Sequence, residues 1–156
     1  MTTGIEIEPV RKTIAVQAPV EKAFAVFTDG IATWWPLQTY SVGADRGGEA
    51  PESAVFEGRV GGRVFERSSD GSESDWGEVL VWEPPRRIVY TWHPGYADPS
   101  IATEVEVRFR ADGGGTRVEI EHRGWERLGE RGPRTRDGYD SGWETVLGRY
   151  TAAFAA

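Results

Sequence analysis

Hydrophobic side chains recur along residues 137–154 at steps of three and four, the spacing that places them on one face of an α-helix. The six residues that form this stripe are Tyr139, Trp143, Val146, Leu147, Tyr150 and Phe154. Polar residues such as Asp140, Glu144 and Arg149 fall mostly on the rest of the helix surface. A stripe with four large aromatic rings needs a cover, and we expect the strands upstream to provide it.

Three glycines interrupt this predicted helix: Gly138, Gly142 and Gly148. Each weakens a helix by about 1 kcal/mol relative to alanine. We therefore expect them to leave room beside Trp143 or to let another backbone come close.

Most of the upstream chain alternates apolar and polar residues with the period of β-strands. We expect strands at residues 11–17, 54–59, 62–67, 76–82, 87–93, 104–110 and 116–122, with connections at residues 37–51, 68–74, 94–100 and 123–136. Short helices at residues 19–28 and 31–35 follow the first strand, because Pro19 suits the start of a helix and Pro36 ends the next one. The order predicts one α+β domain, residues 1–156.

Cross-strand pairing predicts which side chains face the long helix. In the last hairpin, pairing Phe109 with Val118 also pairs Val105 with His122, and all of these side chains then share one face. In the hairpin before it, the side chains predicted on this face are Trp76, Glu78, Leu80, Trp82, Ile88, Tyr90 and Trp92. A slip of one residue would reverse that assignment.

Composition narrows the classes of function. The chain has seven Trp, six Phe and five Tyr, so its apolar content comes as large flat rings that fill a core or line a cavity. A net charge of −7 with interleaved signs argues against nucleic acid as a partner. The absence of Cys excludes disulfides and thiolate chemistry. No run is long and apolar enough to span a membrane, and we expect a cytoplasmic protein.

Two titratable residues are candidates for chemistry. His122 could act as a general base or bind a ligand, or it could be a core histidine whose hydrogen bonds are satisfied. Glu78 could orient a ligand, or it could form a structural ion pair with Arg59 or Arg63. His93 and His122 lie on different strands and opposite faces, so we expect no metal site and no cofactor.

Several short strings together resemble a known family. They are residues 18–24 (APVEKAF), 34–36 (WWP), 61–63 (GGR), 76–80 (WGEVL), 83–92 (EPPRRIVYTW), 115–118 (GTRV), 122–125 (HRGW) and 142–143 (GW). Their order and spacing are similar to those of START-like, or SRPBCC, proteins, in the branch of the C-terminal domain of the heat-shock-protein-90 ATPase activator. The resemblance implies a helix-grip (START/Bet v-like) fold. In this fold a curved seven-stranded antiparallel sheet wraps around the long C-terminal helix and leaves a cavity between sheet and helix.

The function that we expect is binding of a small hydrophobic or aromatic ligand in that cavity, without catalysis. The residues predicted to contact it are Trp34, Trp35, Phe65, Trp76, Glu78, Leu80, Tyr90, Trp92, Val107, His122, Tyr139, Trp143 and Leu147. Two alternatives stay open: a co-chaperone-like domain that stimulates a chaperone ATPase, and a cyclase- or hydrolase-like enzyme that uses His122 and Glu78. The chain is expected to be a monomer or a homodimer.

Overall fold

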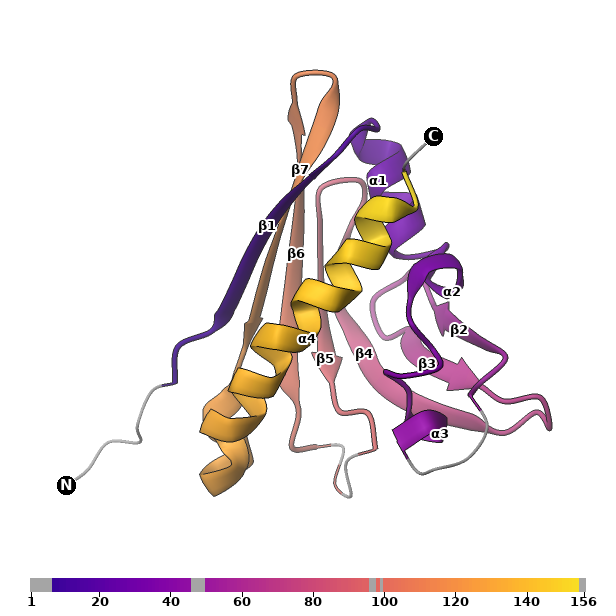
Figure 1. Ribbon diagram of the computed structural model, residues 1–156, viewed down its shortest axis with the longest axis vertical. Helices are drawn as coiled ribbons and strands as arrows, with labels where there is room; N and C mark the ends of the chain where they lie inside the picture. Colours follow the sequence, from indigo (N-terminus) through magenta and orange to yellow (C-terminus); the bar gives the residue numbers. More distant parts are fainter. Residues whose placement is uncertain (1–6, 46–49, 96–97, 99, 155–156) are drawn as a thin grey trace.

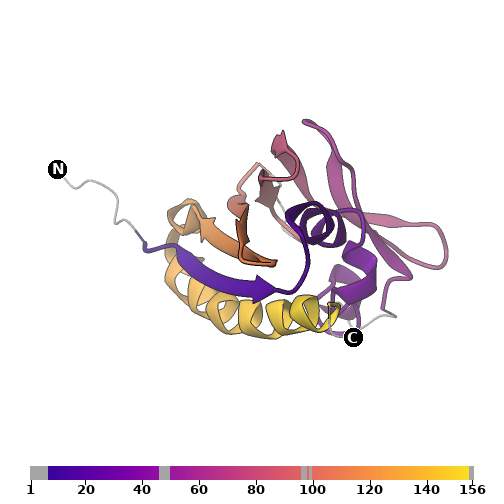
Figure 2. The same cartoon turned by 90° about the horizontal axis from the view of Figure 1, so that it is seen from above.

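The protein is a curled antiparallel sheet that wraps around one long helix (Figure 1). The computed structural model describes residues 7–45, 50–95, 98 and 100–154. Its elements are β1 (Val10–Val16), α1 (Val20–Phe27), α2 (Ile31–Trp34), α3 (Val42–Asp45), β2 (Ser53–Phe56), β3 (Arg63–Arg67), β4 (Glu73–Glu83), β5 (Arg87–Trp92), β6 (Thr103–Asp112), β7 (Gly115–Arg123), the 3-10 helix η1 (Trp125–Arg131) and α4 (Gly132–Ala152). The strand order is β1-β7-β6-β5-β4-β3-β2. Seen from above, α4 lies along the concave side of the sheet (Figure 2). The predicted helix-grip fold is confirmed.

The long helix buries the predicted stripe but begins earlier than expected. Trp143, Val146, Leu147 and Tyr150 are buried against the sheet. The helix begins at Gly132 rather than at residue 137, and Pro133 in its first turn is the start signal. Two further differences are the short helix α3 inside the predicted loop 37–51, and β4, which begins inside the predicted turn 68–74.

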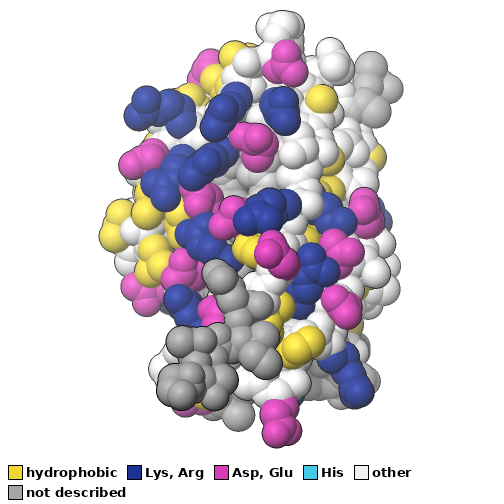
Figure 3. Space-filling view, turned by 90° about the vertical axis from the view of Figure 1, so that its left-hand side faces the viewer, with side chains coloured by type: hydrophobic (Ala, Val, Ile, Leu, Met, Phe, Trp, Pro, Cys, Tyr) yellow, Lys and Arg dark blue, Asp and Glu magenta, His cyan; other side chains and the backbone are white. Residues whose placement is uncertain are grey.

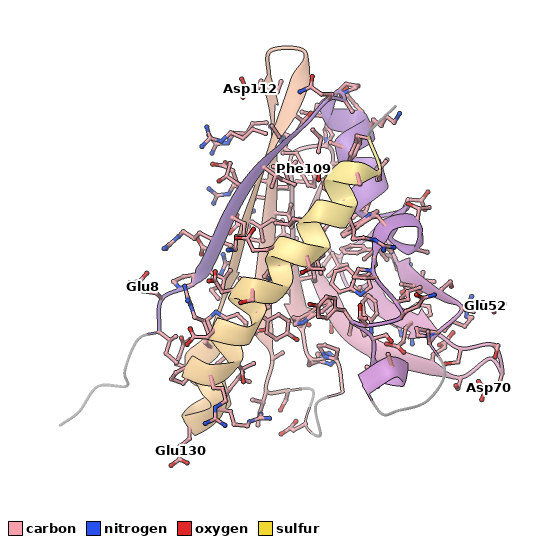
Figure 4. The ribbon with its side chains drawn as sticks, viewed as in Figure 1. Glu8, Glu52, Asp70, Phe109, Asp112 and Glu130 are labelled. Carbon is pink, nitrogen blue, oxygen red and sulfur yellow. The ribbon has the colours of Figure 1, made fainter. Side chains whose placement is uncertain are left out.

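The half of the grip near the C-terminal end of α4 is filled by interlocking aromatic rings. Phe109 of β6 lies 5.2 Å from Phe24 and 5.8 Å from Phe27 of α1, measured between ring centroids. Tyr150 of α4 lies 5.3 Å from Phe27 and 5.0 Å from Trp34. Figure 4 shows Phe109 in the interior beside α4. Edge-to-face contacts of this kind add to the area buried, so this half is a closed core.

The register of the last hairpin is the predicted one, with Val105 opposite His122 and Phe109 opposite Val118. In β4 the prediction is wrong for Glu78 and Leu80, which face away from the helix. A β-bulge places Leu80 as an extra residue between the Val79–Tyr90 and Val81–Val89 pairs. The residues before the bulge therefore face the opposite way from the one that alternation counted back from Trp82 predicts. A second bulge, where β3 pairs with β4, turns Trp76 inward again.

The predicted ion pairs of Glu78 are also wrong. Its side chain is exposed, and Arg63 pairs instead with Glu73 and Asp75. Arg59 pairs with Glu57.

The outer face of the sheet carries a dense network of ion pairs. Lys and Arg side chains interleave with Asp and Glu on the side of the molecule that lies at the left in Figure 1 (Figure 3). At the centre of the network, the nearly buried carboxylate of Glu106 accepts hydrogen bonds from Arg87 at 2.6 Å, Arg108 at 2.7 Å and Arg123 at 2.6 Å. Burial by itself raises the pKa of Glu106, but these hydrogen bonds outweigh it and lower the pKa to about 2.

We expect Glu106→Gln to lower the free energy of unfolding at pH 7 by about 1–3 kcal/mol, because it removes charge-assisted hydrogen bonds. The folded-state pKa lies below the ordinary value of 4.5, so this stabilisation is present above that pH and is lost as pH falls toward 2. Urea titrations at several pH values measure both effects. Glu119→Gln is the control, because its contacts with Arg110 and Arg117 are longer and more exposed. Equal losses in the two variants would contradict the prediction.

Candidate functional site

A cavity of about 380 Å³ lies in the other half of the grip, beside the first part of α4. Its walls come from the segment between α2 and α3, the start of α3, the inward side of β4, the end of β5 with the loop after it, and α4. The aromatic wall side chains are Trp35, Tyr40, Trp76, Trp92, Tyr139 and Trp143. The cavity is partly open to solvent, and most of its surface is apolar.

The four tryptophans in the wall all use their indole N–H groups in hydrogen bonds within the protein. Trp35 donates to the carbonyl of Tyr40 at 2.7 Å, and Trp92 donates to the hydroxyl of Tyr139 at 2.9 Å. Trp76 donates to the carboxylate of Glu66 at 2.7 Å, and Trp143 to Nδ1 of His122 at 3.0 Å. Because an indole has one polar hydrogen and each of these is already engaged, the four side chains offer no free N–H donor to a guest.

One stripe of the helix wall of the cavity, beside Tyr139 and Trp143, is made of small residues. Thr135, Gly138, Gly142 and Val146 recur at steps of three and four and all line it. A Cβ atom built on Gly138 or Gly142 would meet no atom within 4 Å, so these glycines border open space. The sequence left two explanations for these glycines, and the structure matches the first of them, room beside Trp143.

A buried carboxylate holds the wall opposite the helix. Glu66 of β3 is 1% exposed and accepts hydrogen bonds from the backbone N–H of Val42 at 2.6 Å and of Gly43 at 3.0 Å, as well as from Trp76. Val42 and Trp76 both line the cavity. Glu66 therefore fixes the loop carrying α3 against the sheet, one layer behind the cavity surface.

His122 is a core residue with both ring nitrogens engaged. It is fully buried, and its Nδ1 accepts the hydrogen bond from Trp143. Its Nε2 therefore carries the proton and donates to the hydroxyl of Thr103 at 2.8 Å. Burial lowers the pKa of His122 to about 3, so the ring is neutral. Of the two roles weighed for this residue, the geometry matches the satisfied core histidine.

The structure brings together five of the thirteen residues predicted to contact a ligand: Trp35, Trp76, Trp92, Tyr139 and Trp143. Five others are buried away from the cavity surface: Trp34, Tyr90, Val107, His122 and Leu147. The remaining three, Phe65, Glu78 and Leu80, point to the opposite face of the sheet. Phe65 lies there between Arg63 and Arg67, whose guanidinium carbons are 4.1 and 5.4 Å from its ring centroid.

Sequence reasoning missed most of the wall that precedes α3. Thr39, Tyr40, Ser41 and Val42 line the cavity from a segment that was predicted only as a loop. The available signal was the stretch of apolar and hydroxyl side chains after Pro36. The missed anchor, Glu66, sits between Phe65 and Arg67 in a strand where alternation alone does not show which polar residue is buried.

Other classes of site find no support in the described residues. No cluster of three or more His, Cys, Asp or Glu side chains there could hold a metal ion. In the same part of the chain, no helix combines the length and the apolar character needed to cross a membrane.

The fold and the cavity together define a helix-grip protein with a pocket between its sheet and its C-terminal helix. The chain belongs to the family described as Activator of Hsp90 ATPase homolog 1-like protein, which matches residues 17–155. No curated protein sequence matches the chain significantly.

Solved structures with the same fold include proteins of different description. An anthrahydroquino-Gama-pyrone synthase, Txn09 complexed with SUM, is 35% identical, with a TM-score of 0.64 over 94% of this chain and 97% of that one. The self-sacrificing resistance protein CalC from Micromonospora echinospora is 28% identical, with a TM-score of 0.69 over 94% of each chain. The Aha1 dimer from Colwellia psychrerythraea is 17% identical, with a TM-score of 0.66 over 95% of this chain and 96% of that one, and shows the shared fold alone.

Proposed function

We propose that this protein binds a small, flat aromatic molecule in the cavity between its sheet and α4. The observation that carries the proposal is an open, mostly apolar space bordered by the rings of Trp35, Trp76, Trp92, Tyr139 and Trp143. Trp35, Trp76 and Trp92 pack against one another with ring centroids 5.2 to 5.6 Å apart, so they form a continuous aromatic wall beside this space. Ligand sites are typically concave and apolar, with a few polar groups that fix orientation. Here the hydroxyls of wall residues such as Ser41 and Thr135 supply those polar groups.

The size of the cavity limits the guest. A cavity of about 150 Å³ accommodates benzene, and this one has a volume of about 380 Å³. We therefore expect two or three fused rings to fit best.

Fluorescence titration tests the proposal, because four of the seven tryptophans line the cavity. Naphthalene and anthracene derivatives should quench tryptophan emission saturably, with one guest bound per chain. Native mass spectrometry provides the stoichiometry. A panel of two-, three- and four-ring aromatics that gives no saturable quenching and no bound mass would contradict the proposal.

Cyclase-like catalysis is the second candidate, and the 35% identity to a protein described as a synthase favours it. The version that uses His122 and Glu78 as acid and base finds no support, because neither side chain reaches the cavity. Tyr139 does line it, with its hydroxyl hydrogen-bonded to the indole of Trp92. Mass spectrometry of a bound polyketide-type precursor over time distinguishes turnover from simple binding. The co-chaperone role and the oligomeric state stay predictions.

A further inference from the structure

We infer that the cavity selects aromatic guests that carry a positive charge, in particular a quaternary ammonium group beside the ring system. This inference rests on the proposed function and adds the chemical class of the ligand. It is carried by three observations: the aromatic wall with its indole N–H groups already engaged, the buried Glu66 carboxylate, and the absence of cations among the described residues of the cavity wall.

The wall rings offer negative potential to a guest. An aromatic ring is negative over its face, and indole is the strongest such group among the side chains. The four wall tryptophans already donate their positive N–H groups to Tyr40, Glu66, Tyr139 and His122, so none is free to repel a cation. Trp35, Trp76 and Trp92 pack together as one aromatic wall beside the cavity, and aromatic rings that border a site bind quaternary ammonium groups by cation–π attraction.

Glu66 adds a full negative charge behind this wall. Both of its oxygens accept hydrogen bonds, three in all, from Val42, Gly43 and Trp76. Three donors and no acceptor match the ionised form, which only accepts. Within the described part of the chain, no ion pair includes Glu66. Only the buried side chain of Trp76 and the backbone of Val42 separate it from the cavity, so its field is screened little by water on the way to the cavity wall.

Among the described residues that line the cavity there is no Lys, Arg or His. An anionic guest would meet π faces and a carboxylate field without a cation to compensate. A primary ammonium would need acceptors for three hydrogens, whereas a quaternary ammonium needs none and is attracted by the ring faces. The net charge of −7 also favours the approach of cations.

The test compares three probes of nearly equal shape, titrated against the wild-type chain. They are naphthylmethyl-trimethylammonium, its uncharged carbon isostere neopentylnaphthalene, and naphthylmethanesulfonate. We expect the cation to bind about tenfold more tightly than the neutral isostere, in line with cation–π attraction in a desolvated site, and the sulfonate to bind most weakly. If the neutral isostere binds as tightly as the cation, the inference is overturned and the proposed function stands. If none of the three binds, the proposed function fails as well.

A matched pair of variants tests the role of Glu66. Glu66→Gln removes the buried charge, and Glu78→Gln removes the same charge from the exposed face of a neighbouring strand. Glu66→Gln should lower the ratio of the affinity for the cation to the affinity for the neutral isostere severalfold, whereas Glu78→Gln should leave this ratio unchanged. An unchanged preference in a folded Glu66→Gln variant would overturn the role of this carboxylate. If circular dichroism shows that the variant is unfolded, the comparison of the three probes on the wild type still decides the inference.

Discussion

Replacing Gly142 by leucine is expected to weaken binding of naphthalene-sized guests by about tenfold to a hundredfold. A Cβ at this position meets nothing within 4 Å, so the new side chain extends into the cavity and occupies the space of the guest. Forcing extra methylene groups into a filled space costs about 1–3 kcal/mol, which corresponds to this loss of affinity. The fold itself should be stabilised by roughly 1 kcal/mol, because leucine favours the helix over glycine. Fluorescence titration and urea unfolding measure the two effects.

Gly148→Leu is the matched control on the same helix. Gly148 is exposed, a Cβ there also meets nothing within 4 Å, and the residue lies outside the cavity wall. We expect the same gain in helix stability with unchanged affinity. If Gly142→Leu binds as tightly as Gly148→Leu, the cavity is not the binding site.

Truncating His122 is expected to cause the largest loss of stability. His122→Ala leaves the indole N–H of Trp143 and the hydroxyl of Thr103 without their partner, and it opens a void in the core. We expect the free energy of unfolding at pH 7 to fall by about 3 kcal/mol or more. His93→Ala is the control, because its side chain is partly exposed. Similar losses in both variants would contradict the structural role assigned to His122.

The protonation of His122 also predicts a pH dependence. The folded-state pKa of about 3 lies below the ordinary value of 6.5, so between these values the unfolded chain binds a proton that the folded chain does not. Stability from the neutral ring is complete above pH 6.5 and is lost as pH falls toward 3, by up to about 1.4 kcal/mol per pH unit. His122→Asn, which cannot titrate, should show a smaller slope over this range. Equal slopes of stability against pH in the wild type and in His122→Asn would show that His122 takes up its proton in the folded state as readily as in the unfolded chain.

The fold was predictable because its signals are local and repeated. The stripe that includes Trp143 and Tyr150 is strongly periodic, and the pairing of Phe109 with Val118 fixes a whole hairpin once one pair is chosen. The sequence patterns that resemble the family agree with this order of elements. Five of the predicted ligand contacts line the cavity because large rings on inward positions were favoured.

The rest of the site depends on features that alternation cannot show. A bulge inserts one residue into a strand, so Glu78 and Leu80 both lie on the outer face instead of the inner face that unbroken alternation predicts. Phe65 is buried, but beneath two arginine side chains on the outer face. The buried position of Glu66 depends on donors from residues more than twenty positions away in the sequence, at Val42 and Gly43.

A crystal structure of the chain with naphthylmethyl-trimethylammonium tests the central claim most directly. We predict density for one guest in the cavity. Its ring system should lie against the indoles of Trp35 and Trp92 on one side and near the backbone of Gly142 on the other. Wall side chains that close on one another and leave no space there, with the guest absent or bound elsewhere on the surface, would contradict it.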